Sequence, residues 1–466
     1  MVGFARGLRA RFMGLAMAAM LGACSSLPIV VPDMARTRGP VQVEGADGKL
    51  LSTSQSKAII DRLTAGGKQT TVLDRHLAVE EAIAGNPLTA GNAAILLEDG
   101  PATYAAMLAA IRSARDHINM ETYIIEADEV GEKFAAALID KQRQGVQVNF
   151  IYDSVGAIST PKEYFKRLKD AGIKVLEFNP VNPVNAKAGW DVNQRDHRKI
   201  LVVDGQTAFL GGINISGVYS TGSASAGSSI GSGKAKDRPW RDTDLQLSGP
   251  VVADLQKMFI ETWKAQKGEP LAQRNYFPKI APKGKEVVRA IASAPDEPFS
   301  PIYATFLSAI NSAESEILLT NAYFVPDPQL VDALIAAVAR GVDVRMVLPS
   351  TTDSWLVFHA GRAHYDRLLE GGVKLYERED ALLHSKTALI DGVWSTVGST
   401  NLDWRSFLHN QEVNAVILGA GFGQRMRASF EQDVAASRAI TLEAWRQRPL
   451  SDRLKEAFGR LWEYWL

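Results

Sequence analysis

The sequence predicts an α/β protein made of two fused copies of one layered α/β/α domain. From about residue 93, short apolar runs alternate with amphipathic helical patterns, and this order of elements produces a buried sheet covered by helices. The same order returns after residue 286, and each copy leads to a histidine and a lysine spaced two residues apart. With 466 residues, the chain is long enough for two such domains.

In chain order, the two copies lie between segments of different composition. Residues 24–90 are expected to form a Pro-containing tether followed by helices. The first copy spans 91–266, a linker rich in Pro, Lys and Gly covers 267–285, the second copy spans 286–440, and a helical tail covers 441–466. In the first copy we expect strands at 93–97, 117–125, 146–152 and 173–178, and helices at 102–115, 131–144 and 162–171.

Internal sequence matches support the duplication. Residues 306–313 resemble 107–114, and residues 369–375 resemble 169–175. The matched segments occur in the same order in both copies. Their separation is far too long for a solenoid repeat, so we interpret them as one duplicated domain.

Two segments leave alternatives open. The first copy carries a Gly/Ser-rich insert at 216–236, which is either a flexible lid over the predicted site or a surface loop without function. The aromatic residues that end the helical tail either sit at a membrane interface or pack against the protein. We favour packing, because amphipathic helices usually bury their apolar face.

Composition restricts the classes of partner. Lys plus Arg and Asp plus Glu each number 52, so the formal net charge is zero. A nucleic-acid-binding protein usually shows a basic excess, so no nucleic-acid partner is expected. The chain has one cysteine, Cys24, which excludes an intramolecular disulfide.

The first residues resemble a secretion signal. Three arginines precede an apolar run at 12–21, and Leu-Gly-Ala then leads to Cys24. This layout is similar to a bacterial lipoprotein signal. We therefore expect a signal peptide at 1–23, lipid attachment at Cys24, and a lipid-anchored, periplasm-facing place in the bacterial cell envelope, at the outer membrane rather than the inner. The alternative is an ordinary signal peptide with an incidental cysteine.

A histidine-lysine-aspartate motif occurs once in each copy. Its residues are His197, Lys199 and Asp204 in the first copy and His384, Lys386 and Asp391 in the second. Alternation along an extended strand would place the histidine and lysine on the same face. A Gly-x-x-Asn sequence follows each motif, at 211–214 and 398–401. One such match could arise by chance, but two in matched settings disfavour the alternative of unrelated core histidines.

The repeat and its motifs resemble the phospholipase D superfamily over roughly residues 91–440. The segments most similar to bacterial cardiolipin synthases are 121–124, 153–156, 211–214, 240–242 and 398–406. The forms most similar lack an N-terminal pair of transmembrane helices. The resemblance implies that His197 is the nucleophile and His384 the acid/base, although the sequence itself is symmetric on this point.

Two histidines in one cleft suit phosphoryl transfer. If the copies fold back about a pseudo-twofold axis, His197 and His384 face each other at the interface between them. One histidine attacks phosphorus and forms a phosphohistidine. The other protonates the leaving alkoxide and then deprotonates the incoming alcohol. Lys199 and Lys386 neutralise the phosphate oxygens, so neither a metal nor a cofactor is expected.

Other polar residues complete the predicted site. Neutral donors to the phosphate are expected from Asn214, Ser399 and Asn401. Asp242 and Glu412 occupy matching positions and match the family's acids that orient the histidines, with Asp244 a weaker candidate. Gly212 stands where the second copy has Ser399, so the halves are not equivalent. We interpret Asp204 and Asp391 as turn and salt-bridge residues that fix the motif.

These observations lead to a functional hypothesis. We expect a membrane-associated phosphatidyltransferase of cardiolipin synthase type, which transfers a phosphatidyl group from phosphatidylglycerol, or from phosphatidylethanolamine, to a phospholipid head-group hydroxyl. One alternative is a phospholipase D that hydrolyses phospholipids to phosphatidic acid. A nuclease of the same superfamily and an inactive, lipid-binding envelope lipoprotein are further alternatives, although zero net charge and two intact motifs weigh against them.

Overall fold

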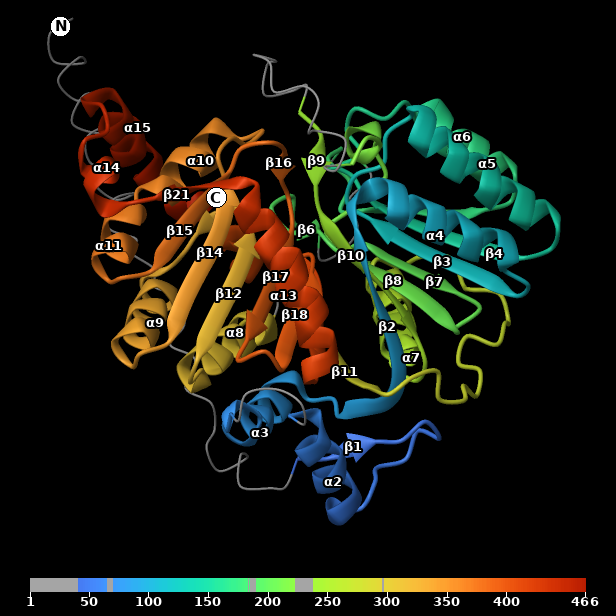
Figure 1. The fold of residues 1–466 in the computed structure, drawn as a ribbon. Helices are drawn as coiled ribbons and strands as arrows, with labels where there is room; N and C mark the ends of the chain where they lie inside the picture. Colours follow the sequence, from blue (N-terminus) through green and yellow to red (C-terminus); the bar gives the residue numbers. More distant parts are fainter. Residues whose placement is uncertain (1–40, 65–69, 183, 185–189, 223–237, 296) are drawn as a thin grey trace, which may run out of the picture. The chain divides into compact units, whose positions relative to one another are not determined.

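The computed structural model describes residues 41–64, 70–182, 184, 190–222, 238–295 and 297–466 (Figure 1). These residues all belong to one unit of the chain, which spans Pro32–Leu466. The predicted signal peptide at 1–23, the lipid attachment at Cys24 and residues 223–236 of the Gly/Ser-rich insert lie outside the described residues.

The first copy forms one half of a long mixed sheet. Its strand order is β5-β4-β3-β7-β8-β10-β2, in which β3, β4 and β5 are parallel and the remaining neighbours are antiparallel. The strands are β2 (Leu88–Glu98), β3 (His117–Thr122), β4 (Gln147–Asp153), β5 (Lys174–Phe178), β7 (Ile200–Val203), β8 (Thr207–Gly211) and β10 (Thr243–Ser248).

The second copy repeats this order as β15-β14-β12-β17-β18-β20-β11, with the same directions. Its strands are β11 (Glu286–Ser293), β12 (Glu316–Asn321), β14 (Asp343–Pro349), β15 (Lys374–Arg378), β17 (Lys386–Ile390), β18 (Trp394–Gly398) and β20 (Asn410–Leu418). The prediction of a duplicated α/β fold is therefore confirmed, and the expected strands of the first copy differ from the observed ones by a few residues at their ends.

The two halves of the sheet join at β2 and β11, which pair antiparallel, with Thr89 opposite Val288 (Figure 1). Short strands form further pairs with the long strands or with each other, including three near the predicted site and the C-terminus. These three involve β6 (Arg195–Asp196), β9 (Trp240–Arg241), β16 (Leu382–Leu383) and β21 (Ser437–Ile440).

The helices that cover the sheet also correspond between copies. They are α4 (Asp99–Ser113), α5 (Glu129–Arg143), α6 (Lys162–Asp170) and α7 (Val252–Ala265), matched by α8 (Pro301–Ser312), α9 (Pro328–Ala339), α11 (Tyr365–Glu370) and α13 (Ala420–Ala435). Equivalent aspartates start two of them. Asp128 accepts the amide of Val130 at the start of α5, and Asp327 accepts the amide of Leu330 at the start of α9, as expected of N-caps.

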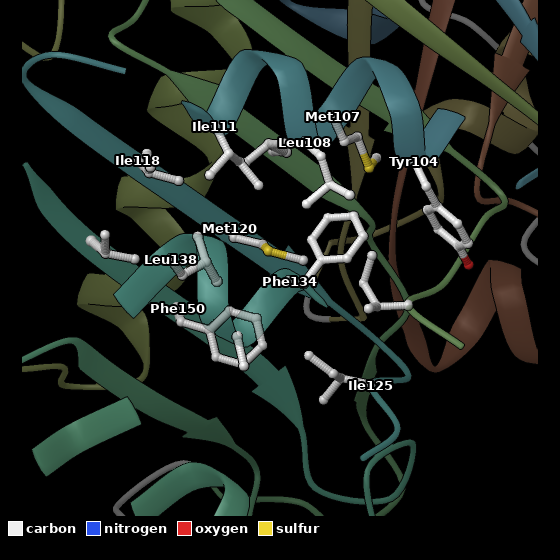
Figure 2. Packing of buried hydrophobic residues seen from close by; sticks show 14 of the residues in the cluster. Tyr104, Met107, Leu108, Ile111, Ile118, Met120, Ile125, Phe134, Leu138 and Phe150 are labelled. Carbon is white, nitrogen blue, oxygen red and sulfur yellow. The ribbon is translucent and has the colours of Figure 1, made fainter. Parts of the chain in front are cut away.

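Alternation along β7 shows where the core layers lie. Leu201 and Val203 belong to a cluster between the sheet and helices α4 and α5, where Phe134 and Phe150 are fully buried (Figure 2). Ile200 and Val202 point to the other face and enter a second cluster with α7. This second cluster continues into the strands of the other copy and into α13, so the copies share one core.

The motif strand is shorter than predicted. Strand β7 begins at Ile200, so the prediction that His197 and Lys199 lie within it is wrong. The amide of His197 instead donates to the carbonyl of Gln411 in the other copy. The two side chains nevertheless lie on the same side, because both contact the ring of Tyr123.

Helices precede and follow the duplicated domain. The helices expected within residues 24–90 are α2 (Thr53–Leu63) and α3 (Val72–Ala84), and the tail contains α14 (Leu442–Arg446) and α15 (Leu450–Arg460). The prediction that the tail buries its apolar face is wrong for α15, whose leucines and phenylalanine are exposed. In the part of the chain that the structure covers, no helix is both long and apolar enough to cross a bilayer.

Candidate active site

The two motif histidines are held by acids from opposite copies. Nδ1 of His197 lies 3.0 Å from Oε1 of Glu412, and Nδ1 of His384 lies 2.6 Å from Oδ2 of Asp242. Both acids are fully buried. When a carboxylate accepts the proton on Nδ1, Nε2 is left available for chemistry. The two acids predicted to orient the histidines therefore do so in a crossed arrangement.

Short strand pairs across the seam, the boundary between the two copies, fix the backbone of each histidine. Beside the β6–β20 pair, the amide of His197 donates to the carbonyl of Gln411 at 3.0 Å. Beside the β9–β16 pair, the amide of His384 donates to the carbonyl of Arg241 at 2.7 Å. Each carbonyl belongs to the residue just before the orienting acid. One stretch of the opposite copy thus positions both the main chain and the ring of each histidine.

Each motif lysine lies against its own histidine. Nζ of Lys199 donates to the carbonyl of His197 at 2.5 Å. Lys386 donates to the carbonyl of His384, and its Nζ lies 3.0 Å from Nδ1 of that ring. Burial lowers the pKa of Lys199 to about 7 and the pKa of Lys386 to about 8. An anion between the two lysines would reverse both shifts, as expected of a site that binds a phosphate group.

Both motif histidines are buried beside the two lysines. His197 is 8% exposed and His384 is 4% exposed. Burial, followed by the charges of Lys199 and Lys386, holds the pKa of His197 well below its usual range. Burial also lowers the pKa of His384, while Asp242 opposes this effect. Because groups of the second motif act on His197, both motifs contribute to one site, and His197 is neutral near pH 7.

The two orienting acids have different surroundings. Ser399 donates its hydroxyl to Oε2 of Glu412 at 2.5 Å and accepts the amide of Val413. At the equivalent glycine of the first copy, a Cβ atom would fall 2.2 Å from Oδ1 of Asp242. Gly212 therefore leaves room for Asp242, whereas Ser399 supports the longer Glu412. Ser399 remains a predicted phosphate ligand, but its hydroxyl is donated to Glu412 in this structure.

The predicted asparagine donors differ in their contacts. Asn214 accepts the amide of Ile124 and donates to the hydroxyl of Tyr219 at 3.2 Å. That hydroxyl lies 3.3 Å from Nδ1 of His384, so Asn214 supports the site through Tyr219. Oδ1 of Asn401 is buried and has no hydrogen-bond partner among the described residues. A phosphate-binding role for Asn214 and Asn401 stays a prediction.

The motif aspartates lie at the far end of their strands. Asp204 accepts the backbone amides of Arg115, Asp116 and His117 at 2.8 to 3.0 Å. Asp391 accepts the corresponding amides of residues 314–316. Both adopt a positive φ, of 52° and 50°, where they turn the chain. They therefore anchor each motif strand to the start of its neighbour, and the four residues between them and the lysines span more than about 13 Å.

Several residues near the site had no role in the sequence-based prediction. The ring of Tyr123 lies 5.0 Å from that of His197, and the ring of Tyr323 lies 5.9 Å from that of His384. Arg198 donates from Nε to the carbonyl of Glu412 at 3.1 Å and ties it to the first copy. The position of Arg198 within the motif was the available signal, but a strand pattern cannot show which carbonyl an arginine reaches.

The weaker candidate acid has a different environment. Asp244 is fully buried, and its Oδ1 accepts the amide of Ile213 at 3.1 Å. Burial raises the pKa of Asp244 to about 8. The acid that contacts His384 is instead Asp242, which lies two residues before Asp244 in the chain. Among the described residues, no three His, Cys, Asp or Glu side chains form a group that could hold a metal ion.

Comparisons with known proteins agree with this architecture. A family model described as "Cardiolipin synthase, PLD-like domain" matches residues 107–222 and 306–434. A duplicated domain with one histidine-lysine motif in each copy defines a phospholipase D-like protein. The chain belongs to the cardiolipin synthase family of these proteins.

Two curated relatives and one solved structure illustrate the match. The chain is 36% identical over 379 residues to a cardiolipin synthase of Alkalihalophilus pseudofirmus, covering 81% of this chain and 73% of that protein. It is 35% identical over 377 residues to the major cardiolipin synthase of Bacillus subtilis, covering 80% and 75%. The phosphatidylserine synthase structure from Haemophilus influenzae shares the fold, with a TM-score of 0.60 and 14% identity over 83% of this chain and 99% of that one.

Proposed function

We propose that this protein is a membrane-associated phosphatidyltransferase of cardiolipin synthase type. The observation that carries the proposal is the crossed pair of contacts, His197 with Glu412 and His384 with Asp242, beside two buried lysines. Such a site offers a nucleophile, an acid/base and a cradle for one phosphate group. Relatives named cardiolipin synthase, at about the same level of identity over most of the chain, support this choice of reaction.

In the first half-reaction, Nε2 of His197 attacks the phosphorus of phosphatidylglycerol. The bond from phosphorus to the glycerol head group breaks, and His384, which enters this step as an imidazolium held at Nδ1 by Asp242, gives its Nε2 proton to the leaving alkoxide and becomes neutral. Glycerol leaves, and a phosphatidyl-histidine remains. Glu412 stabilises the positive charge that this places on the His197 ring, because its carboxylate already lies at Nδ1.

In the second half-reaction, the head-group hydroxyl of another phospholipid takes the place of glycerol. His384 removes its proton, the oxygen attacks phosphorus, and the bond from phosphorus to His197 breaks. With phosphatidylglycerol as acceptor, the product is cardiolipin. Phosphatidylethanolamine can serve as donor in the same scheme, in which case ethanolamine leaves first. Lys199 and Lys386 neutralise the phosphate oxygens in both steps.

Hydrolysis to phosphatidic acid competes with transfer, because water can also attack the intermediate. The burial of both histidines favours transfer, since it limits the access of water to the phosphohistidine. Purified protein given labelled phosphatidylglycerol is expected to yield cardiolipin and glycerol. Phosphatidic acid as the main product, or cardiolipin at the level of a His197→Ala control, would contradict the proposal.

We further propose that Cys24 carries a lipid anchor and that the protein faces the periplasm from the outer membrane. The support comes from the arginines, the apolar run and the Leu-Gly-Ala-Cys sequence at the start of the chain. Metabolic labelling with a fatty acid tests it, because Cys24→Ser should remove the label. Retention of the label in that variant would contradict lipid attachment at this residue.

A further inference from the structure

Helix α15 presents an apolar face to solvent. Leu454 is 63% exposed and Phe458 is 50% exposed, and Leu450 and Leu461 are also exposed. The spacing of these residues, by four, four and three positions, places them along one side of the helix. A stripe of this kind normally faces the core of a protein, so its exposure needs an explanation.

The opposite side of α15 faces the protein and is polar or small. Glu456 and Gly459 are buried, and a Cβ atom at Gly459 would fall 2.6 Å from the amide nitrogen of Ala360 in α10 (Trp355–Arg362). Glu456 also pairs with Arg448 at 2.9 Å. The helix is therefore docked firmly by its polar face, and its apolar face is left outward.

Aromatic side chains extend the exposed stripe. Trp355 of α10 is exposed, and its ring lies 6.3 Å from that of Phe458. We define the apolar ridge as Trp355, Leu450, Leu454, Phe458, Leu461, Trp462 and Trp465, all of which are exposed. Tryptophan is enriched where protein meets the boundary between lipid head groups and acyl chains.

Basic side chains flank the apolar ridge. Arg453, Lys455 and Arg460 are exposed on α15 itself. Arg446 and Arg448 pair with Glu370 and Asp366, while Lys455 and Arg460 lie 3.0 and 4.0 Å from Asp452 and Glu463. Exposed ion pairs are weak, so the exposed basic side chains of α15 can exchange these partners for anionic lipid head groups.

Two connections link the apolar ridge to the active site. Asp353, two residues before Trp355, accepts the hydroxyl of Tyr323 at 2.5 Å, and the Tyr323 ring packs against His384. At the chain's last residue, the carbonyl of Leu466 accepts the amide of Arg405 at 2.9 Å. Arg405 is close enough to contribute to the lowered pKa of His197. The apolar ridge is therefore connected to His384 through Asp353 and Tyr323, and to Arg405 through the last residue of the chain.

We propose that the apolar ridge docks on the surface of an anionic phospholipid bilayer. Its leucine, phenylalanine and tryptophan side chains enter the boundary below the head groups, while the flanking arginines and lysine contact anionic lipid. Docking there holds the site next to the head groups on which it acts. The choice of a bilayer, rather than a protein partner or a second copy, rests on the flanking charges and on the proposed function.

A fluorescent probe at Phe458 tests this contact. The full chain with Cys24→Ser has no other cysteine, so Phe458→Cys can be labelled with an environment-sensitive dye. Phe277→Cys is the matched control, because Phe277 is 54% exposed in the linker between the copies. With vesicles of phosphatidylethanolamine and phosphatidylglycerol, we expect a blue shift, and quenching by spin-labelled acyl chains, at position 458 only. Equal emission changes at both positions would overturn the proposal.

A second measurement separates docking from catalysis. We expect the double variant Leu454→Asp/Phe458→Asp to lower phosphatidyl transfer on vesicles by about tenfold or more. Its transfer on detergent-dispersed substrate should stay within about twofold of the parent. The control Phe277→Asp should change neither rate. A vesicle-specific loss that also occurs in Phe277→Asp would overturn the proposal, as would a change in oligomeric state with unchanged transfer on vesicles. If the parent transfers nothing on either substrate, the proposed function fails, and the probe at position 458 still decides whether the ridge docks.

Discussion

Glu412 contacts the ring of His197 although the two residues are 215 positions apart and belong to opposite copies of the domain. The reciprocal contact joins Asp242 to His384. Each copy therefore supplies one histidine and the acid that orients the other histidine. A site of this kind is complete only when both copies are folded together, which gives a physical reason for the fusion of the two copies in one chain.

Removing the charge of Glu412 should impair chemistry much more than folding. For Glu412→Gln we expect a fall in kcat of about 10²- to 10⁴-fold, because the His197 ring loses the partner that stabilises its charged form. Steady-state transfer assays and thermal unfolding measure the two effects. Glu431→Gln is the matched control, since Glu431 pairs with Arg345 at the surface of α13. Equal losses in both variants would contradict a role specific to the site.

The lowered lysine pKa values predict the alkaline limit of activity. In the free protein, burial lowers the pKa of Lys386 to about 8 and that of Lys199 to about 7. Rising pH removes the charge of Lys199 first and that of Lys386 second, so kcat/KM should begin to decline near pH 7 and fall further as the pH passes about 8. Since the pKa of His197 is held well below 6.5, its neutral form persists in mild acid. Burial raises the pKa of Glu412 to about 7, so protonation of Glu412, rather than of His197, should lower activity as the pH falls below about 7.

Arginine substitutions check which group sets the alkaline limit. Lys386→Arg keeps a positive charge at high pH, so any remaining activity should no longer fall near pH 8. The profile of kcat/KM against pH is the measurement. A parent profile that stays flat to pH 10, or an arginine variant that still declines near pH 8, would show that Lys386 does not control this limit.

Space beside Asp242 should depend on the glycine at position 212. In Gly212→Ala the new Cβ would meet Oδ1 of Asp242 at 2.2 Å, so the carboxylate must move and release His384. We expect kcat to fall by about tenfold or more. Gly421→Ala is the matched control, because a Cβ there meets nothing within 4 Å. Normal activity of Gly212→Ala would mean that Asp242 tolerates displacement.

The motif aspartates should contribute to stability rather than to chemistry. Asp204→Ala leaves three backbone amides without their acceptor, and we expect it to lower the free energy of unfolding by about 1–3 kcal/mol. Asp204→Asn should cost less, because asparagine keeps one acceptor oxygen and tolerates the positive φ at this position. Denaturant unfolding measures the difference. A large loss of kcat at normal stability would instead assign Asp204 to catalysis.

Much of the fold could be predicted from the sequence because local signals repeat. Equivalent places in the two copies hold the apolar runs that form β3 and β12. The same is true of the aspartates that cap α5 and α9. The histidines, the lysines and the two orienting acids were also identified from paired motifs. Each of these signals is a residue type at a fixed spacing, and spacing is what a sequence records directly.

Contacts across the seam could not be predicted in this way. No spacing indicates that Glu412 reaches His197 or that the backbone of His197 pairs with Gln411, and this pairing is why β7 starts only at Ile200. The hydroxyl of Ser399 was assigned to phosphate because nothing in the sequence shows its bond to Glu412. The exposure of Phe458 was missed for a related reason, since an amphipathic pattern does not say which side faces the protein.

The pairing of β2 with β11 has a consequence for how lipids enter and leave. A sheet and a core that pass without a break from one copy to the other form a stiff frame, so the halves cannot swing apart like the domains of a hinged enzyme. Access of lipids to the histidines must come from smaller movements of loops and side chains around them. Turnover should therefore respond to substitutions in those loops, and a crosslink that ties β2 to β11 should leave it unchanged.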